Sequence, residues 1–180
     1  MGRDKSRLVV GGKPILSYLL ERFSWAGPTM LVTGPGNEHP PGWELFGREV
    51  VDPVADLGPL RGLLTALEAA GTERVVVATV DMPGMGAGQL DWLLGRLGTR
   101  ENRLGVMCLR CGVREPFPFA CRVAAREVVA ERLARGVRSV HSLAEVPGFA
   151  EEVAPGWEDG VWVNLNLPSD YEEFVRRAEE

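Results

Sequence analysis

The sequence predicts an α/β fold with a mostly parallel sheet and helices on both faces. Segments with apolar residues at helical spacing alternate with short β-branched runs, a pattern typical of βα units. The run VVVATV at residues 75–80 is apolar without alternation, as strands buried on both faces of a parallel sheet are. The length of 180 residues suits one domain spanning residues 1–180, because two domains would each lack core.

Helices are predicted where apolar residues recur three and four positions apart. In PILSYLLERFSW this spacing follows Pro14, which suits a first helical turn. In GPLRGLLTALEAA the leucines share one face, and Gly71 is predicted to end the helix as a C-terminal glycine. The predicted helices cover residues 14–25, 58–70, 90–97, 124–135 and 169–179, with a further short helix at residues 139–146.

Strands are predicted from short apolar runs that end in Gly, Pro or Asp. TMLVT is closed by GPG, REVV ends at Asp52-Pro53, and VVVATV ends at Asp81 before Met-Pro. The predicted strands cover residues 29–33, 48–51, 74–80, 104–113, 117–121 and 161–165, with a strand or loop at residues 8–12.

Composition argues against several classes of protein. There are 20 Lys and Arg against 25 Asp and Glu, a net charge of −5, which disfavours nucleic-acid partners. No stretch reaches the roughly 18 apolar residues of a membrane helix, and MGRDKSR lacks the apolar segment of a signal peptide. The 3 cysteines are therefore expected to be reduced thiols of a cytoplasmic protein.

Cys108 and Cys111 have CxxC spacing. This spacing can mark a redox pair or half of a zinc site, but no second CxxC is present. The flanking apolar residues favour a strand, in which positions three apart point to opposite faces. Ordinary strand thiols are the favoured interpretation.

Ligands of open α/β sheets bind beyond the carboxyl ends of the strands. There Asp81 is either a Mg²⁺ ligand or a turn cap. Asp52 precedes GPLRG, which is either a docking site for an anion or a purine edge, or a plain helix entry. Lys5 is either a phosphate clamp or part of a solvated charged terminus.

Taken in order, MGRDKSRLVVGGKPIL, VVDPVADLGPLRGLLTAL, VVVATVDMP, PFPFACR, RLARGVRSVHSL and VWVNLNLPSDYEEF resemble the molybdenum cofactor guanylyltransferase family. The resemblance covers essentially the whole chain. Its most specific parts are GPLRGL, DMP and NLNLPSDY. It implies a Rossmann-like nucleotidyltransferase fold.

The resemblance implies catalytic roles for Lys5, which would bind the triphosphate, and for Asp81, which would hold Mg²⁺. The nucleotide-binding set that it implies is Lys5, Thr33, Asp52, Gly58, Pro59, Leu60 and Asp81. Asn164 and Asn166 match the asparagines of an N-x-N-x-P-x-D motif and would bind the second substrate. Leu167 stands where relatives carry Thr, so a helix cap worth about 1 kcal/mol is lost unless another group supplies it.

The implied reaction transfers GMP from GTP to molybdopterin and releases pyrophosphate. The implied partners are GTP, molybdopterin, other cofactor-biosynthesis proteins and apo-molybdoenzymes, with Mg²⁺ as the cofactor. The alternatives are transfer from CTP to molybdopterin, transfer from a nucleoside triphosphate to a sugar phosphate, and non-catalytic binding of molybdopterin or a partner. GPLRGL, close to the GPLAG of guanylyl enzymes, favours GTP.

One part of the family pattern is missing. The family begins with an apolar strand and a glycine-rich loop, roughly L-A-G-G-x-S-x-R-M-G-x-D-K, and this sequence begins at M-G. Two interpretations are a start assigned too late, at the internal Met, and a chain that has lost catalysis. Either way, we expect a sheet that lacks its first strand, with an unfilled slot or a poorly packed groove beside residues 75–80.

Overall fold

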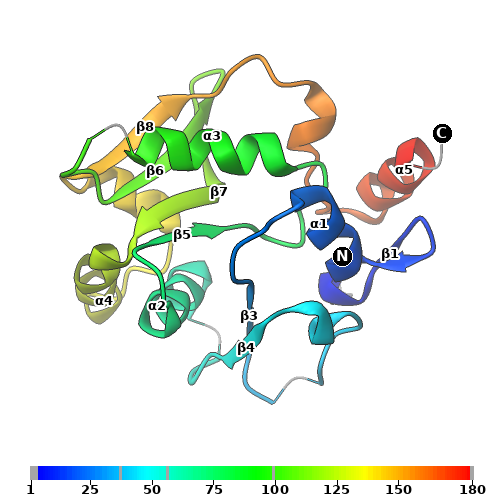
Figure 1. The fold of residues 1–180 in the computed structure, drawn as a ribbon, viewed down its shortest axis with the longest axis horizontal. Helices are drawn as coiled ribbons and strands as arrows, with labels where there is room; N and C mark the ends of the chain where they lie inside the picture. Colours follow the sequence, from blue (N-terminus) through cyan, green and yellow to red (C-terminus); the bar gives the residue numbers. More distant parts are fainter. Residues whose placement is uncertain (1–3, 37, 56, 99, 179–180) are drawn as a thin grey trace.

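The computed structural model describes residues 4–36, 38–55, 57–98 and 100–178 (Figure 1). Met1, Gly2 and Arg3, which open the MGRDK motif, lie outside the described residues. The five longer predicted helices are confirmed, with ends shifted by a few residues: α1 (Ile15–Phe23), α2 (Pro59–Ala69), α3 (Ala87–Gly98), α4 (Arg126–Ala134) and α5 (Pro168–Ala178). The short helix expected at residues 139–146 is a 3-10 helix, Val140–Glu145.

The strands form separate small sheets. They are β1 (Val9–Val10), β2 (Lys13–Pro14), β3 (Met30–Thr33), β4 (Arg48–Val51), β5 (Arg74–Val77), β6 (Gly105–Arg110), β7 (Val113–Arg122) and β8 (Phe149–Val153). β1 and β2 form a hairpin, β3 pairs with β4, and the four-stranded sheet has the order β5-β7-β6-β8. β5 and β3 thus each lie at a sheet edge among the strands that the structure describes, and the slot or groove expected beside residues 75–80 stays a prediction.

The four-stranded sheet is mixed, whereas we expected it to be mostly parallel. β7 runs antiparallel to both β5 and β6, and β8 runs parallel to β6. The reason is a tight turn at Cys111 and Gly112, which have φ of +47° and +78° and reverse the chain between β6 and β7. The strand predicted at residues 104–113 therefore ends too late.

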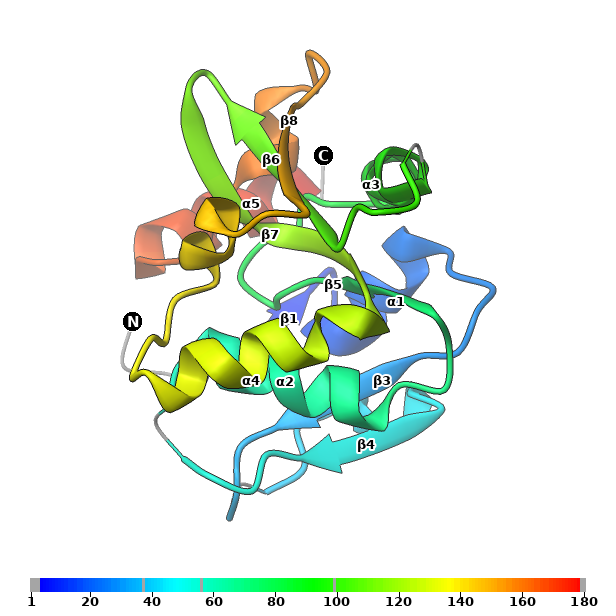
Figure 2. The same ribbon diagram turned by 90° about the vertical axis from the view of Figure 1, so that its left-hand side faces the viewer.

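Helices cover both faces of this sheet, as predicted (Figure 2). Because neighbouring strand residues point to opposite faces, Met107 and Phe119 pack with the leucines of α2 and with Val129 of α4. Val106 and Ala120 pack on the other face with α3.

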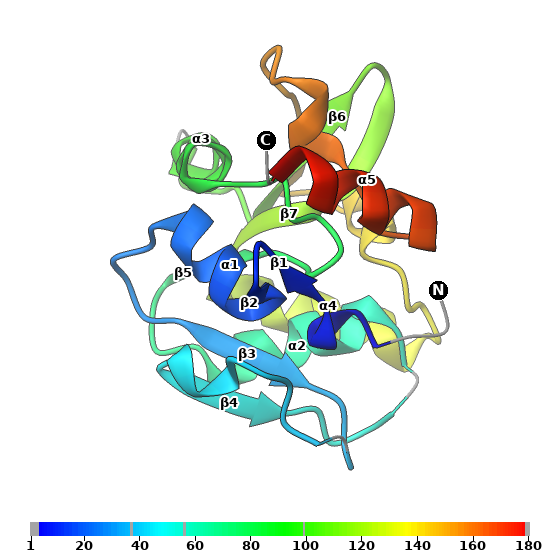
Figure 3. The ribbon, with the colours of Figure 1, turned by 90° about the vertical axis from the view of Figure 1, so that its right-hand side faces the viewer.

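A third core joins the N-terminal hairpin to the C-terminal helix (Figure 3). Val10, Ile15 and Leu16 pack there with Leu165 and Phe174. The hairpin and α1 therefore pack against the C-terminal segment, although more than 150 positions separate Val10 from Leu165. This brings the segment around Lys5 toward the NLNLP segment.

Two features near the C-terminus differ from expectation. β8 was not predicted, and the strand expected at residues 161–165 is wrong. A 3-10 helix, η5 (Asp159–Trp162), and an irregular segment stand in its place. Two apolar residues of that segment are nevertheless buried, with Trp162 8% and Leu165 0% exposed, and Val161 and Val163 are half-buried. Trp162 and Leu165 therefore pack into two hydrophobic cores from a 3-10 helix and an irregular segment, and not from a strand.

The cysteines match the interpretation as ordinary thiols. All three are free, Cys108 and Cys121 are buried, and Cys111 is exposed in the turn. Burial raises the pKa of the Cys108 and Cys121 thiols to about 12. Since the thiolate is the reactive form, we expect Ellman's reagent to label one thiol per native chain and three after denaturation in guanidinium. Rapid labelling of two or three thiols in the native protein would contradict this assignment.

Among the described residues, two features bear on the membrane and metal-binding classes considered above. No helix there is both long and apolar enough to cross a membrane. No group of three or more His, Cys, Asp and Glu side chains is placed there to hold a metal ion.

Candidate functional site

Three segments that are far apart in the sequence meet through polar contacts. Lys5 lies in the 3-10 helix η1 (Lys5–Arg7), Asp81 in the turn after β5, and Asn166 just before α5. The Lys5 Nζ lies 3.5 Å from Asp81 Oδ2 and donates to Asn166 Oδ1 over 3.1 Å. The Lys5 and Asp81 side chains are 25% and 30% exposed. A cation and an anion thus share a site that a ligand can reach.

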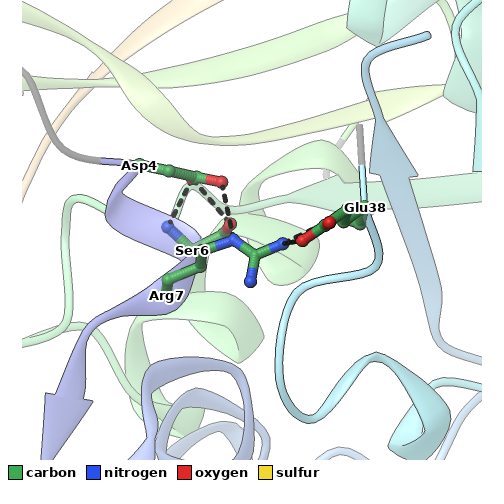
Figure 4. Close-up of polar contacts among 4 residues, drawn as sticks. All are labelled: Asp4, Ser6, Arg7 and Glu38. Atoms are coloured by element: carbon green, nitrogen blue, oxygen red, sulfur yellow. Dashed lines mark hydrogen bonds and ion pairs between the residues drawn. The ribbon is translucent and has the colours of Figure 1, made fainter. Parts of the chain in front are cut away.

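Local contacts fix the helical turn that carries Lys5 (Figure 4). The Asp4 carboxylate accepts from the Ser6 backbone N–H at 3.0 Å and from the Ser6 hydroxyl at 2.6 Å, which caps η1. Arg7 donates to the Glu38 carboxylate at 3.0 Å and so ties η1 to the loop after β3. These contacts limit the positions open to Lys5.

The turn that carries Asp81 is held by its backbone. The Met82 N–H donates to the Thr79 carbonyl at 3.3 Å, and the Asp81 carbonyl accepts from the Leu165 N–H at 2.8 Å. In addition, the Thr79 hydroxyl donates to Asp81 Oδ1. The carboxylate therefore sits on a turn braced against the segment that contains Asn164 and Asn166.

The N-x-N-x-P-x-D segment contains its own helix cap. Asp170 Oδ2 accepts from the backbone N–H of Asn166 at 3.0 Å and of Leu167 at 2.7 Å. An acidic side chain in the first turn that reaches back in this way is one half of a capping box. Asp170 thus binds the N–H groups of Asn166 and Leu167, which differ from the helix N–H groups that a Thr side chain at position 167 would accept from. Asn164 and Asn166 are both exposed, and their contact with a substrate stays a prediction.

Thr33 is the last residue of β3 and Asp52 follows the adjacent parallel strand β4, but their polar groups have partners within the protein. Asp52 is 8% exposed, and its Oδ1 accepts from Arg61 Nε at 3.0 Å. The Thr33 hydroxyl donates to Glu49 Oε1 at 2.8 Å. These contacts assign Asp52 a part in holding the start of α2, and nucleotide contact by either residue stays a prediction.

The GPL segment enters α2 through a backbone that suits glycine. Gly58 has φ of +74°, which favours glycine. Leu60 is 0% exposed, and its backbone N–H donates to the Arg138 carbonyl at 3.1 Å. This N–H therefore already has a hydrogen-bond partner within the protein. Gly58 and Pro59 are exposed and stay the part of the segment predicted to contact a nucleotide.

The donor set at Asp81 fits Mg²⁺. This ion is usually held by one or two carboxylates, with waters and substrate phosphates completing an octahedral shell. Asp81 offers one partly exposed carboxylate beside a lysine that can contact the same phosphates. Such a site needs the nucleotide to complete it, so a cluster of protein ligands is not required.

Sequence reasoning missed three residues that shape the site: Thr79, Arg61 and Asp170. Each had a weak signal. Thr79 lies two positions before Asp81, within reach of a local turn bond, and Asp170 is an acid in the first turn of a helix. Arg61 shares a helix face with Thr65 and Glu68, to which it donates at 3.1 and 3.2 Å.

The sequence profile described as the MobA-like NTP transferase domain matches residues 1–147. A protein named molybdenum cofactor guanylyltransferase, from Cereibacter sphaeroides, is 30% identical over 175 residues, which covers 94% of this chain and 85% of that protein.

Solved structures share the fold. Molybdopterin-guanine dinucleotide biosynthesis protein A from Archaeoglobus fulgidus has a TM-score of 0.74 at 17% identity, with 99% and 92% of the two chains covered. For 2-C-methyl-D-erythritol 4-phosphate cytidylyltransferase from Thermus thermophilus the TM-score is 0.74 at 20% identity, with 98% and 94% covered. A manganese complex of Rv0371C from Mycobacterium tuberculosis H37Rv scores 0.65 at 16% identity, with 96% and 91% covered. The predicted nucleotidyltransferase fold is confirmed.

Proposed function

The chain belongs to the MobA-like NTP transferase family and is thus a nucleotidyltransferase, and from this premise we propose that it transfers GMP from GTP to molybdopterin. The contact of Lys5 with both Asp81 and Asn166 carries the proposal. It joins the residue predicted to bind triphosphate, the residue predicted to hold the metal and the motif predicted to bind the acceptor. One site can therefore hold both substrates.

The chemistry needs charge neutralisation and positioning more than acid–base groups. A terminal phosphate oxygen of molybdopterin attacks the α-phosphorus of GTP, the new P–O bond forms, and the bond from the α-phosphorus to the bridging oxygen breaks, so pyrophosphate leaves. The nucleophile is already an anion, so no side chain has to remove a proton. Lys5 holds the triphosphate through its ammonium group. Asp81 would hold Mg²⁺, which would supply further positive charge when bound.

The guanine preference rests on GPLRGL and on the guanylyltransferase relatives. We place the reaction in the cytoplasm, where the three free cysteines stay reduced. Cofactor-biosynthesis proteins and apo-molybdoenzymes are the proposed partners that exchange substrate and product with this site.

Ligand-induced thermal stabilisation tests the nucleotide choice. A ligand at 100 times its Kd stabilises a protein by about 2.7 kcal/mol, which at this chain length raises Tm by about 5–10 °C. We expect that shift with Mg-GTP and a much smaller one with Mg-CTP at equal concentration. A larger shift with CTP would overturn the guanylyl assignment in favour of cytidylyl transfer. A shift with molybdopterin but with neither nucleotide would favour a non-catalytic binding protein.

A further inference from the structure

The two carboxylate oxygens of Asp81 have different partners. Oδ1 accepts from the Thr79 hydroxyl, and Oδ2 lies 3.5 Å from the Lys5 ammonium. The backbone carbonyl of the same residue accepts from the Leu165 N–H at 2.8 Å. The bond to the Thr79 hydroxyl fixes the orientation of the carboxylate, so one oxygen is hydrogen-bonded and the other points toward Lys5.

Thr79 is held in a position from which its hydroxyl donates to Asp81. Its carbonyl accepts from the Met82 N–H at 3.3 Å, so Thr79 and Asp81 belong to one tight turn after β5. The side chain is β-branched, with a methyl group beside the hydroxyl, which restricts its rotamers. The donor is therefore preorganised before any ligand arrives.

We propose that Thr79 is a positioning residue, which reserves Oδ1 of Asp81 for its own hydroxyl and leaves Oδ2 as the oxygen that a divalent cation can take. This inference rests on the proposed function, because it assumes that a metal–nucleotide complex binds at Asp81. It also goes beyond that function, because it predicts cation selectivity. Mg²⁺ and Mn²⁺ accept single carboxylate oxygens in octahedral shells, whereas the larger Ca²⁺ also takes both oxygens of one carboxylate.

The test compares Thr79→Val, which keeps the shape and loses the hydroxyl, with Thr79→Ser, which keeps the hydroxyl. The probe is Mn²⁺ in the presence of guanosine 5′-(α,β-methylene)triphosphate, a nucleotide that cannot be cleaved at the reacting bond, with free Mn²⁺ followed by electron paramagnetic resonance. We expect Thr79→Val to weaken Mn²⁺ binding about 10-fold, the effect of one lost hydrogen bond to a charged group. Thr79→Ser should stay within about 2-fold of the parent chain.

Competition with Ca²⁺ gives a second readout that a merely structural role would not change. Thr79→Val should shift the ratio of the Mn²⁺ and Ca²⁺ dissociation constants toward Ca²⁺ by a factor of about 5 or more, because Oδ1 loses its bond to the hydroxyl and can then bind the same cation as Oδ2. Thr79→Ser should preserve the ratio. Unfolding temperatures measured without ligand check that both variants are folded.

The outcomes separate the two proposals. Parent-like Mn²⁺ binding and selectivity in Thr79→Val, or an equal defect in Thr79→Ser, would overturn the role of Thr79 and leave the proposed function standing. Failure of the parent chain to bind the Mn²⁺–nucleotide complex would overturn both. Asp81→Asn serves as the reference for a lost metal ligand.

Discussion

Replacing Asp81 with asparagine is expected to lower the rate of guanylyl transfer by a factor of roughly 10² to 10³, as the loss of one group that stabilises transition-state charge does in other enzymes. The substitution keeps the size of the side chain and removes its charge. The Lys5 ammonium 3.5 Å away then faces a neutral amide, and the divalent cation loses its protein ligand. Pyrophosphate release under saturating Mg-GTP and molybdopterin measures the effect.

The matched control is Asp91→Asn, at an exposed position on α3. Its rate should stay within about 2-fold of the parent chain, because a solvated surface charge contributes little to a distant site. If Asp81→Asn retained a rate within about 3-fold of the parent, the carboxylate would have no part in the reaction and the site would lie elsewhere.

Replacing Gly84 with alanine is expected to lower the free energy of unfolding by about 3 kcal/mol. A Cβ at this position would lie 2.0 Å from the Gly160 carbonyl oxygen and 3.0 Å from the Val161 Cα. Both are backbone atoms, so neither can move aside without its segment. The Gly84 carbonyl also accepts from Arg22 Nη2 at 2.8 Å, which ties the same turn to α1.

This close approach joins the turn after Asp81 to η5, so Gly84→Ala should also reduce nucleotide binding. Urea denaturation measures the change in stability. The control is Gly88→Ala in α3, where a Cβ would meet nothing within 4 Å. Helix propensity predicts that this second change raises stability by up to about 1 kcal/mol. Equal stability of Gly84→Ala and the parent chain would show that the turn and η5 do not touch in solution.

Much of the fold could be predicted because apolar patterns report burial. The helices and the strands β3 to β5 follow directly from their leucine and valine spacing. β8 was missed because Glu151 and Glu152 interrupt FAEEV. In the structure these acids pair with Arg114 at 2.5 Å and with Arg103 at 2.8 Å, and such partners lie far away in the sequence.

The strand predicted at residues 161–165 is wrong because burial there does not come from a sheet. Trp162 packs with α3 and its neighbours, whereas Leu165 packs with α1 and α5. One short segment fills two cores, and the pattern of apolar residues alone does not distinguish that from a strand.

The candidate site, like the fold, could be predicted only in part from the sequence. Motifs identified Lys5, Asp81 and Asn166, and the structure brings these three together. Spacing could not reveal that Asp52 pairs with Arg61 or that Thr33 donates to Glu49, because those contacts depend on how α2 and β4 pack. Motif matches therefore identified the candidate site, and the structure adds that the polar groups of Asp52 and Thr33 have hydrogen-bond partners within the protein.

The most direct test is to incubate the purified chain with Mg-GTP and molybdopterin and to follow the products by mass spectrometry. The account predicts equal amounts of molybdopterin guanine dinucleotide and pyrophosphate, and far less of both products with Asp81→Asn. Formation of the cytosine dinucleotide from Mg-CTP at a higher rate, or no dinucleotide from either nucleotide, would contradict the proposed guanylyl transfer.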